Sequence, residues 1–520
     1  MSAVGNKVNN FRMMRGSSCF ALAVLGLFVG VGTSPAADLA GSCCADLEER
    51  IAELEATAAR KGNRKKSLTI SGQVDRVVVW FDDGKSSGTY YGIDNTNSSS
   101  RFTFSGNAKV TPKVSMGFEI MIENEAGGGT SSKASQLDED GKLTSFNPNV
   151  NIPPTIAGGT TTFPGSAIGI PSFNAHNTDA YFADARHVAW WIEHADLGRL
   201  TVGRWDGARV PVTIDLTGHI FLPASASFTL LNGGFFLRGP SGQFYTMTWG
   251  NIVDPAIDPI RTELVRYDSP SYMGFIYSAS LAEAGDYWGT MVRYANEFNG
   301  VRIGGGIGYE RVTDIATPGV VDPNDIAYIG NEPDITAWGF ALSVMHVPTG
   351  LFVQGHYNHF DFGGRVIGAP SGYWGESTVN KKPTDQWLLQ AGISKNFFGY
   401  GNTSIYSEYG EAGDWGADFT DGSGLQGRTY AAAANTTGFV ALAGVTATEV
   451  RMWGLGLAQN VSAAATDLYA GYRHFGADVT CADATTAVCS GGVAVGATGI
   501  IHTLPTKGID VIVMGARVVF

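Results

Sequence analysis

Residues 101–125 read RFTFSGNAKVTPKVSMGFEIMIENE, and the alternation in this stretch decides the fold class. Apolar or small residues occupy the even positions of 101–110, and polar residues occupy the odd ones. A Thr-Pro-Lys turn at 111–113 follows, and the alternation resumes through 114–125. Because a period of two is that of a β-strand with two different faces, we predict two antiparallel strands here. Each is about ten residues long, as a tilted membrane-crossing strand must be.

The same strand–turn–strand unit recurs to the C-terminus. Short turns at 196–198, 299–300 and 348–350 alternate with mostly longer connections, as in transmembrane barrels with periplasmic turns and extracellular loops. We therefore predict an all-β fold, a 16-stranded antiparallel transmembrane β-barrel with long extracellular loops. The predicted strands are 68–81, 100–111, 113–125, 185–195, 198–205, 261–268, 273–281, 288–298, 301–311, 335–346, 351–360, 385–396, 402–409, 448–460, 464–475 and 508–520.

A soluble β-sandwich is the competing architecture, because its strands also alternate between two faces. Aromatic residues near the predicted strand ends favour the barrel, since membrane barrels carry interfacial aromatic girdles. A closed barrel also leaves no unpaired strand edge in hydrocarbon. The girdle candidates are Trp80, Trp288, Tyr294, Phe360, Trp387, Tyr409 and Phe475.

Composition excludes several other classes of protein. Only 16% of the 520 residues are charged, the mean hydropathy is +0.01, and there are 69 glycines. An apolar run of about 18 residues, which a membrane helix needs, is missing beyond the N-terminus. The net charge of -13 argues against nucleic acid as a partner, because such binding needs a basic surface.

Sequence patterns that match enzyme or metal motifs lack the context that those motifs need. GKSSG at 84–88 and GSGLQG at 422–427 fit a nucleophile elbow and a dinucleotide fingerprint by letter, but both lack the required helix. His356 and His359 are three apart, so they point to opposite faces of a strand and cannot share a metal. We expect neither an enzyme nor a cofactor.

The N-terminal region predicts export. Residues 1–36 combine three basic residues, a 12-residue apolar core at 20–31 and small residues at 34–37, as a signal peptide does. We then expect a periplasmic segment at 37–66 and the barrel domain at 67–520. Apolar residues recur at helical spacing in 45–59, which predicts a short helix. This helix is either an oligomer-forming stub or a loosely ordered amphipathic helix.

The cysteines fit an oxidising compartment. Cys481 and Cys489 are close enough in sequence to form a disulfide within one loop. For Cys43 and Cys44 the alternatives are plain cysteines, disulfides between protomers, or a lipidation site that the preceding residues match poorly.

Four features carry a resemblance to a known family. They are SRFTFSG at 100–106, DLGRLTVGR at 196–204, VRYDSP at 265–270, and a last strand that alternates up to the terminal Phe520. Together they resemble the general porins of Gram-negative bacteria, in which a terminal aromatic residue signals membrane insertion. The leader at 38–66 and GGFFLR at 233–238 resemble the alphaproteobacterial porin family more particularly.

The resemblance implies a constriction built by a third long loop, here 206–260, folded into the barrel. Arg101, Arg204 and Arg266 match wall arginines that face acidic groups on that loop. The alternation of faces along the strands supports an inward Arg101 and allows an inward Arg266. Arg204 shares the lipid-facing positions of its strand, so it would need a bulge or a position above the apolar belt. The acidic candidates are Asp206 and Asp215, with Asp254 and Asp258 as weaker ones.

The alternation of strand positions between the two faces places further arginines in the lumen: Arg293, Arg302, Arg451, Arg473 and Arg517. For each one the alternative is a salt-bridged structural residue or a residue at the headgroup interface.

The expected function is passive diffusion of ions and small hydrophilic solutes through a water-filled outer-membrane channel. One alternative is a substrate-specific channel for sugars or anions. Another is a surface adhesin or outer-membrane enzyme whose loops at 126–180 and 410–447 carry the activity. The resemblance implies a homotrimer in a lipid bilayer with lipopolysaccharide, inserted by the barrel assembly machinery.

Overall fold

In the computed structural model, the described residues are 66–95, 97–123, 184–209, 214–223, 235–253, 261–282, 287–313, 334–362, 382–417, 428–430, 439–440, 442–482 and 501–520. The predicted signal peptide, the helix at 45–59, Cys43, Cys44, Cys489, Asp254 and Asp258 lie outside them. No helix of the described part is both long and apolar enough to cross a bilayer.

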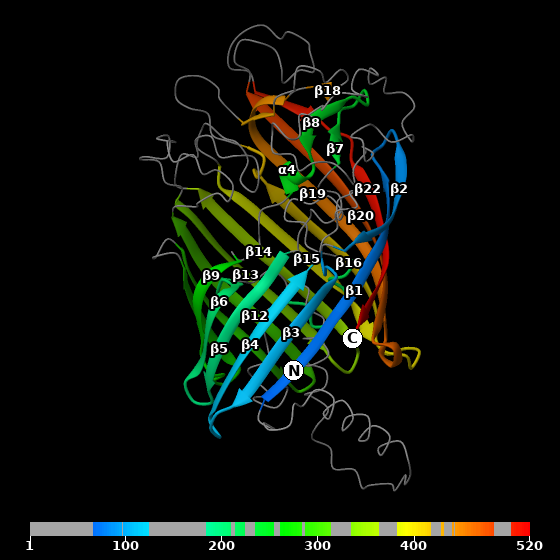
Figure 1. The fold of residues 1–520 in the computed structure, drawn as a ribbon. Helices are drawn as coiled ribbons and strands as arrows, with labels where there is room; N and C mark the ends of the chain where they lie inside the picture. Colours follow the sequence, from blue (N-terminus) through cyan, green and yellow to red (C-terminus); the bar gives the residue numbers. More distant parts are fainter. Residues whose placement is uncertain are drawn as a thin grey trace, which may run out of the picture.

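A closed barrel forms the body of the molecule (Figure 1). Each wall strand pairs antiparallel with the next, and the last strand returns to the first with Arg517 opposite Asp75. The predicted 16-stranded antiparallel barrel is confirmed. Its strands are β1 (Lys66–Asp82), β3 (Arg101–Lys109), β4 (Val114–Glu123), β5 (Asp184–His194), β6 (Gly198–Asp206), β9 (Arg261–Asp268), β10 (Phe275–Ala282), β11 (Tyr287–Phe298), β12 (Val301–Thr313), β13 (Asp334–His346), β14 (Leu351–Phe362), β15 (Thr384–Lys395), β16 (Thr403–Gly413), β19 (Leu442–Val461), β20 (Thr466–Ala482) and β22 (Ile509–Val519).

Short elements extend the sheet beyond the ring. Strands β2 (Ser87–Asp94), β17 (Arg428–Tyr430) and β21 (Ile501–Pro505) pair with β1, β19 and β20 respectively. The 3-10 helix η5 (Ser462–Ala464) connects β19 to β20.

Turn chemistry fixes the register of the hairpins. Between β11 and β12 the two-residue turn Asn299-Gly300 has φ values of 49° and 76°, and Phe298 pairs with Val301. A type I′ turn needs positive φ at both central residues, which Asn and Gly tolerate best. The turn therefore sets which side chains of β11 and β12 face each other.

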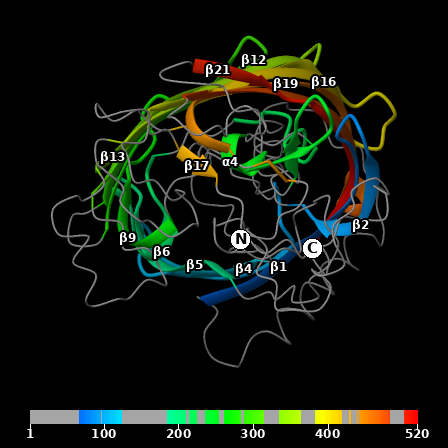
Figure 2. The same cartoon turned by 90° about the horizontal axis from the view of Figure 1, so that it is seen from above.

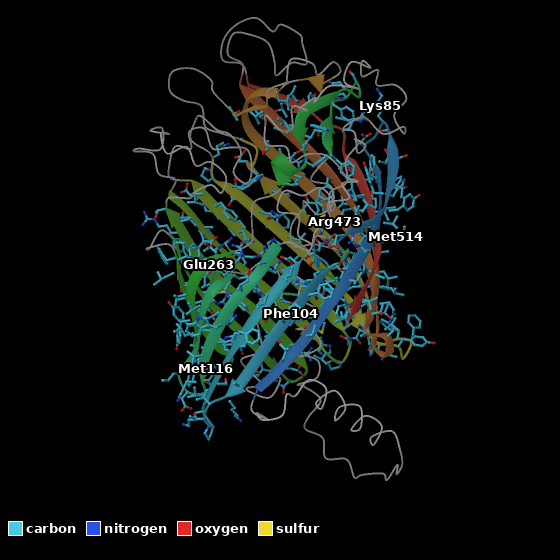
Figure 3. All side chains as sticks on the ribbon, viewed as in Figure 1. Lys85, Phe104, Met116, Glu263, Arg473 and Met514 are labelled. Atoms are coloured by element: carbon cyan, nitrogen blue, oxygen red, sulfur yellow. The ribbon has the colours of Figure 1, made fainter. Side chains whose placement is uncertain are left out.

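Large apolar side chains cover the outer face. Phe104, Met116 and Met514 lie there, and Figure 3 shows them along the wall. Trp–Tyr pairs recur on this face from β11 to β20, with ring centroids 5.1–5.5 Å apart. The pairs are Trp288–Tyr309, Trp338–Tyr357, Trp387–Tyr409 and Trp453–Tyr472.

Two of the predicted girdle residues do not belong to this belt. Phe360 and Phe475 are buried on the inner face, so that expectation is wrong for them. Each joins an apolar cluster inside the barrel, Phe360 with Trp415 and Phe475 with Trp249. Their positions near strand ends do not reveal this, because an aromatic residue favours strands whichever face it occupies.

A small second layer lies inside the ring. It contains the three-stranded sheet of β7 (Phe236–Arg238), β8 (Phe244–Thr248) and β18 (Phe439–Val440), followed by the four-residue helix α4 (Gly250–Val253). Figure 2 shows α4 within the circle of wall strands. We call residues 235–253 the inner lobe.

Candidate functional site: the inner wall

The inner face of the barrel collects the polar side chains of the wall strands. On β14, Gln354, His356 and Asn358 are buried on the inner face, while Leu351 and Val353 are exposed on the outer face. The strand period of two produces this separation. The inner wall is therefore the candidate functional site.

Arginines on the inner wall are paired with carboxylates of the wall itself. One carboxylate can serve two arginines, since Asp268 receives both Arg266 and Arg293 and Glu123 receives both Arg101 and Arg186. The N–O distances are Arg101–Glu123 3.9 Å, Arg186–Glu123 2.7 Å, Arg266–Asp268 2.9 Å, Arg293–Asp268 2.8 Å, Arg302–Glu297 3.1 Å, Arg473–Glu408 2.7 Å and Arg517–Asp467 3.0 Å.

Burial explains these pairs. The guanidinium groups are almost fully covered, and a buried charge without a partner is strongly destabilising. The acidic partners expected from sequence all lay in the loop, so the wall carboxylates were not predicted: Glu123, Asp268, Glu297, Glu408 and Asp467. Strand parity could have found them, because each occupies an inner position of its strand.

Two arginines expected in the lumen lie elsewhere. Arg204 shares the face of its exposed register neighbours Val188 and Glu263, and its Nε donates to the carbonyl oxygen of Ala185 at 2.7 Å. The β6–β9 register runs through Arg204 without the bulge that an inward position would have required. The expectation that Arg204 lines the pore is corrected accordingly.

Arg451 also lies on the outer face, where 53% of its side chain is exposed and Glu449 binds it. The residues beside it in sequence, Val450 and Met452, face inward and are fully buried. On this part of β19 the inner face is the apolar one, because the inner lobe packs on it. The polarity rule used to assign faces is reversed there.

The two acidic candidates both lie inside the barrel, in different surroundings. Asp206, at the end of β6, accepts from Arg261 at 3.1 Å and lies 3.2 Å from His187 Nε2. Asp215 accepts the backbone N–H of Thr217 at 2.8 Å, so it stabilises its own turn. Only Asp206 is therefore joined to the wall by these bonds.

Residues 207–209 and 214–223, which we call the wall segment, follow the inner wall from β10 to β1. The N–H of Ala208 donates to Ser280 Oγ at 2.8 Å, and Arg209 Nε lies 2.7 Å from Glu310. Farther along, His219 Nε2 lies 2.7 Å from Ser404 Oγ on β16. Apolar side chains of the same segment pack on β13, β14 and β16.

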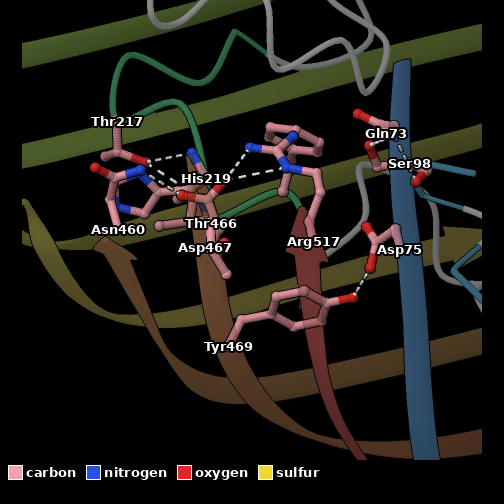
Figure 4. A network of polar contacts seen from close by, with 12 residues as sticks. Gln73, Asp75, Ser98, Thr217, His219, Asn460, Thr466, Asp467, Tyr469 and Arg517 are labelled. Carbon is pink, nitrogen blue, oxygen red and sulfur yellow. Dashed lines mark hydrogen bonds and ion pairs between the residues drawn. The ribbon is translucent and has the colours of Figure 1, made fainter. Parts of the chain in front are cut away.

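A polar network fixes the end of the wall segment where the barrel closes (Figure 4). Asn95 Nδ2 donates to the carbonyl oxygen of Leu222 at 3.0 Å and to Tyr469 Oη at 2.8 Å. Tyr469 in turn donates to Asp75 on β1. The network thereby links β1 and β20 to the wall segment.

His219, a titratable residue of the wall segment, lies near this network (Figure 4). Burial lowers its pKa, and the nearby carboxylates of Asp215 and Asp467 oppose the shift only in part. The imidazole is therefore favoured in its neutral form inside the barrel.

The inner lobe forms an apolar core with one side of the wall, which was not predicted from sequence. Leu237, Met247 and Trp249 are buried against inward-facing Val79 and Val511. The sequence signal was present, since VVVWF at 77–81 is apolar on both parities and predicts a strand buried on both faces.

One buried ion pair holds the lobe to the wall. Arg238 Nε lies 2.6 Å from Asp83, Arg238 Nη1 donates to the carbonyl oxygen of Gly242 at 2.7 Å, and the guanidinium covers the ring of Phe244 at 3.8 Å. Burial lowers the pKa of Arg238, and the Asp83 carboxylate opposes this shift. The contact keeps β7 beside the turn that follows β1.

A metal site and a disulfide are the remaining features to place on the described part of the chain. Within the described ranges, no three His, Cys, Asp or Glu residues are grouped as a metal site would need. Cys481 is disulfide-bonded, but Cys489 lies outside those ranges, so the Cys481–Cys489 pairing stays a prediction.

Comparison with known proteins decides the family. The family model described as Gram-negative porin matches residues 21–501. The chain belongs to the Gram-negative porin family. This porin is accordingly a multi-pass outer-membrane β-barrel, a channel for passive diffusion. No curated protein sequence matches it.

Solved structures give distant likenesses to this porin. An anion-selective porin from Comamonas acidovorans is 15% identical with a TM-score of 0.45, and the match covers 88% of this chain and all of that one. OmpF of Salmonella typhi in complex with daunomycin is 10% identical with a TM-score of 0.40, covering 88% and 98%. The channel DcaP of Acinetobacter baumannii is 9% identical with a TM-score of 0.38, covering 89% and 100%.

Proposed function

We propose that this porin is a general-diffusion channel, conducting ions and small hydrophilic solutes with weak charge selectivity. The pairing of inner-wall arginines with wall carboxylates is the observation that carries the proposal. Paired charges of opposite sign on one wall orient dipolar solutes locally but leave little net field to exclude either ion. The wall segment, residues 207–209 and 214–223, narrows the lumen and acts as the constriction loop.

Planar-bilayer recordings test this proposal. We expect single-channel currents that scale with salt, and a small reversal potential in a potassium chloride gradient. A protein that inserts but passes no current would contradict the channel. Block by one solute at micromolar concentration, without block by its analogues, would instead establish a substrate-specific channel.

We also propose a homotrimer, with the outer face from β22 through β1 to β9 in contact with other copies. On the described strands of that sector no Trp–Tyr pair forms at the level of the belt. Its outer face instead carries charged Arg76, Arg204 and Glu263, which lipid would solvate poorly. Cross-linking in native membranes should give trimers, and exclusively monomeric protein would contradict the proposal.

The finer family assignment is likewise a proposal. GGFFLR at 233–238 and the leader at 38–66 support an alphaproteobacterial origin. A phylogeny of porin sequences that placed this chain outside that group would contradict it.

A further inference from the structure

His187 lies on the inner face of β5 between two carboxylates. Its Nδ1 is 2.8 Å from Glu119 Oε1 on β4, and its Nε2 is 3.2 Å from Asp206 Oδ2 at the end of β6. Both separations are hydrogen-bond distances. The ring also stacks on Trp205, with centroids 3.9 Å apart and planes at 28°, so the directions of both nitrogens are fixed.

Two carboxylate partners are satisfied only by a hydrogen on each ring nitrogen. An ionised carboxylate only accepts hydrogen bonds, and a neutral imidazole donates from one nitrogen while the other carries a lone pair. Neutral His187 donates either to Glu119 or to Asp206, and its remaining nitrogen then faces a carboxylate oxygen with no hydrogen between them. The other oxygen of Asp206 already accepts from Arg261 Nε at 3.1 Å. The imidazolium form of His187 makes both contacts.

Other charged groups face this cluster from each neighbouring strand. A bulge in β5 turns Arg186 inward beside His187, and Arg186 Nη1 lies 2.7 Å from Glu123. Glu123 is thereby engaged by an arginine of its own. The complete set consists of Glu119 and Glu123 on β4, Arg186 on β5, Arg199 and Asp206 on β6, and Arg261 on β9.

Asp206 is the residue at which β6 ends and the wall segment begins. The carbonyl oxygens of Asp206 and Gly207 both accept from Arg266 Nη1 at 3.2 Å, and the next residue, Ala208, donates to Ser280. These bonds tie the start of the segment to β9 and β10. His187 supplies the corresponding tie to β4 and β5.

We propose that His187 is a positioning residue, a proton-dependent clamp that holds the start of the wall segment against β4 and β5. This inference rests on the proposed channel function, in which the wall segment narrows the lumen. Loss of the proton removes one of the two carboxylate contacts and one positive charge from the inner wall. As the pH rises, the pore therefore becomes more cation-selective and residues 206–209 are held less firmly.

Reversal potentials in a potassium chloride gradient test the charge. Wild-type protein, His187→Gln and His187→Lys are compared across the range in which histidines in proteins titrate, about pH 5 to 9. The cation-to-anion permeability ratio of wild-type should rise by about twofold or more with pH. His187→Gln should show the high ratio already at acidic pH, and His187→Lys, which keeps a cation, should retain the low ratio at alkaline pH.

Hydrogen exchange of detergent-solubilised protein tests the clamp independently of conduction. At the acidic end of the range, peptides containing 206–209 should exchange faster in His187→Gln than in wild-type, and at the wild-type rate in His187→Lys. Peptides from β13 should exchange equally in all three proteins. Heat-modifiability on gels confirms that each variant is folded, and His187→Asn and His187→Arg replace any variant that is not.

The two measurements separate failure of the clamp from failure of the channel. If wild-type passes no current, the channel function fails, and exchange still decides the clamp. A wild-type permeability ratio that does not change with pH overturns the proposal without any variant. Equal pH profiles in wild-type and His187→Gln, or a lysine variant that behaves as the glutamine variant does, overturn it as well.

Discussion

Replacing Arg238 by Gln should release the inner lobe from the wall. The substitution removes the guanidinium that lies 2.6 Å from the buried carboxylate of Asp83. Breaking a buried ion pair on one side costs about 3–5 kcal/mol. Since each 1.4 kcal/mol is a factor of ten, docking of the lobe should weaken by about a hundredfold or more.

Hydrogen exchange of detergent-solubilised protein, followed by mass spectrometry, measures this effect. Peptides covering 235–253 should lose protection in Arg238→Gln, whereas peptides from β13 and β14 should not change. Arg451→Gln is the matched control, because its guanidinium is exposed on the outer face. The control should leave exchange of the lobe as in wild-type.

A double-mutant cycle with Asp83→Asn separates the ion pair from other contacts of Arg238. The double variant should be less destabilised than the sum of the two single variants, because the second change removes the stranded partner. Additive effects, or unchanged protection in Arg238→Gln, would refute the assignment of the pair as the anchor of the lobe.

Three further outcomes are expected. Burial lowers the pKa of His219 while the wall segment lies on the inner wall, so a proton binds His219 better when the segment is detached. Attachment of the wall segment should therefore be unaffected above about pH 6.5, the ordinary pKa of histidine, and should weaken as the pH falls below it. Exchange of 214–223, compared at each pH with His219→Asn, should show this, and identical curves would contradict it. Gly117→Ala places a methyl group 2.4 Å from the inward-facing indole of Trp191 and 2.5 Å from the carbonyl oxygen of Gly106, so it should displace the indole, strain the β3–β4 pairing and reduce conductance. Gly106→Ala, whose methyl group meets the outer-face ring of Phe118, should not reduce conductance, and equal currents from the two variants would count against the reasoning. Phe520→Ala should lower the yield of heat-modifiable, folded protein in the outer membrane, and a normal yield would show that the terminal aromatic is not the insertion signal.

The barrel could be predicted from sequence because its strands repeat one local rule many times. The stretch 101–125 shows the rule clearly, and the β3–β4 register follows it with Arg101 opposite Glu123. Alternation needs no knowledge of distant residues, since one face meets lipid and the other meets the interior. The turn at Asn299-Gly300 is equally local, because its backbone conformation requires those residue types.

The interior could be predicted only in part, because its contacts join residues distant in sequence. Parity placed Arg101, Arg266 and Arg517 inward, but it could not show which carboxylate each would meet. It also assumed a polar inner face everywhere, and this assumption failed for Arg451. That reversal depends on the inner lobe, which begins about 200 residues earlier in the chain.

The inner lobe has a consequence for assembly of the barrel. It packs against β1, near the start of the barrel domain, and against β20 and β22, at its end. Residues of the lobe thus contact both strands of the β22–β1 seam. Closure of the seam and docking of the lobe therefore stabilise each other, because each brings together surfaces that the other needs.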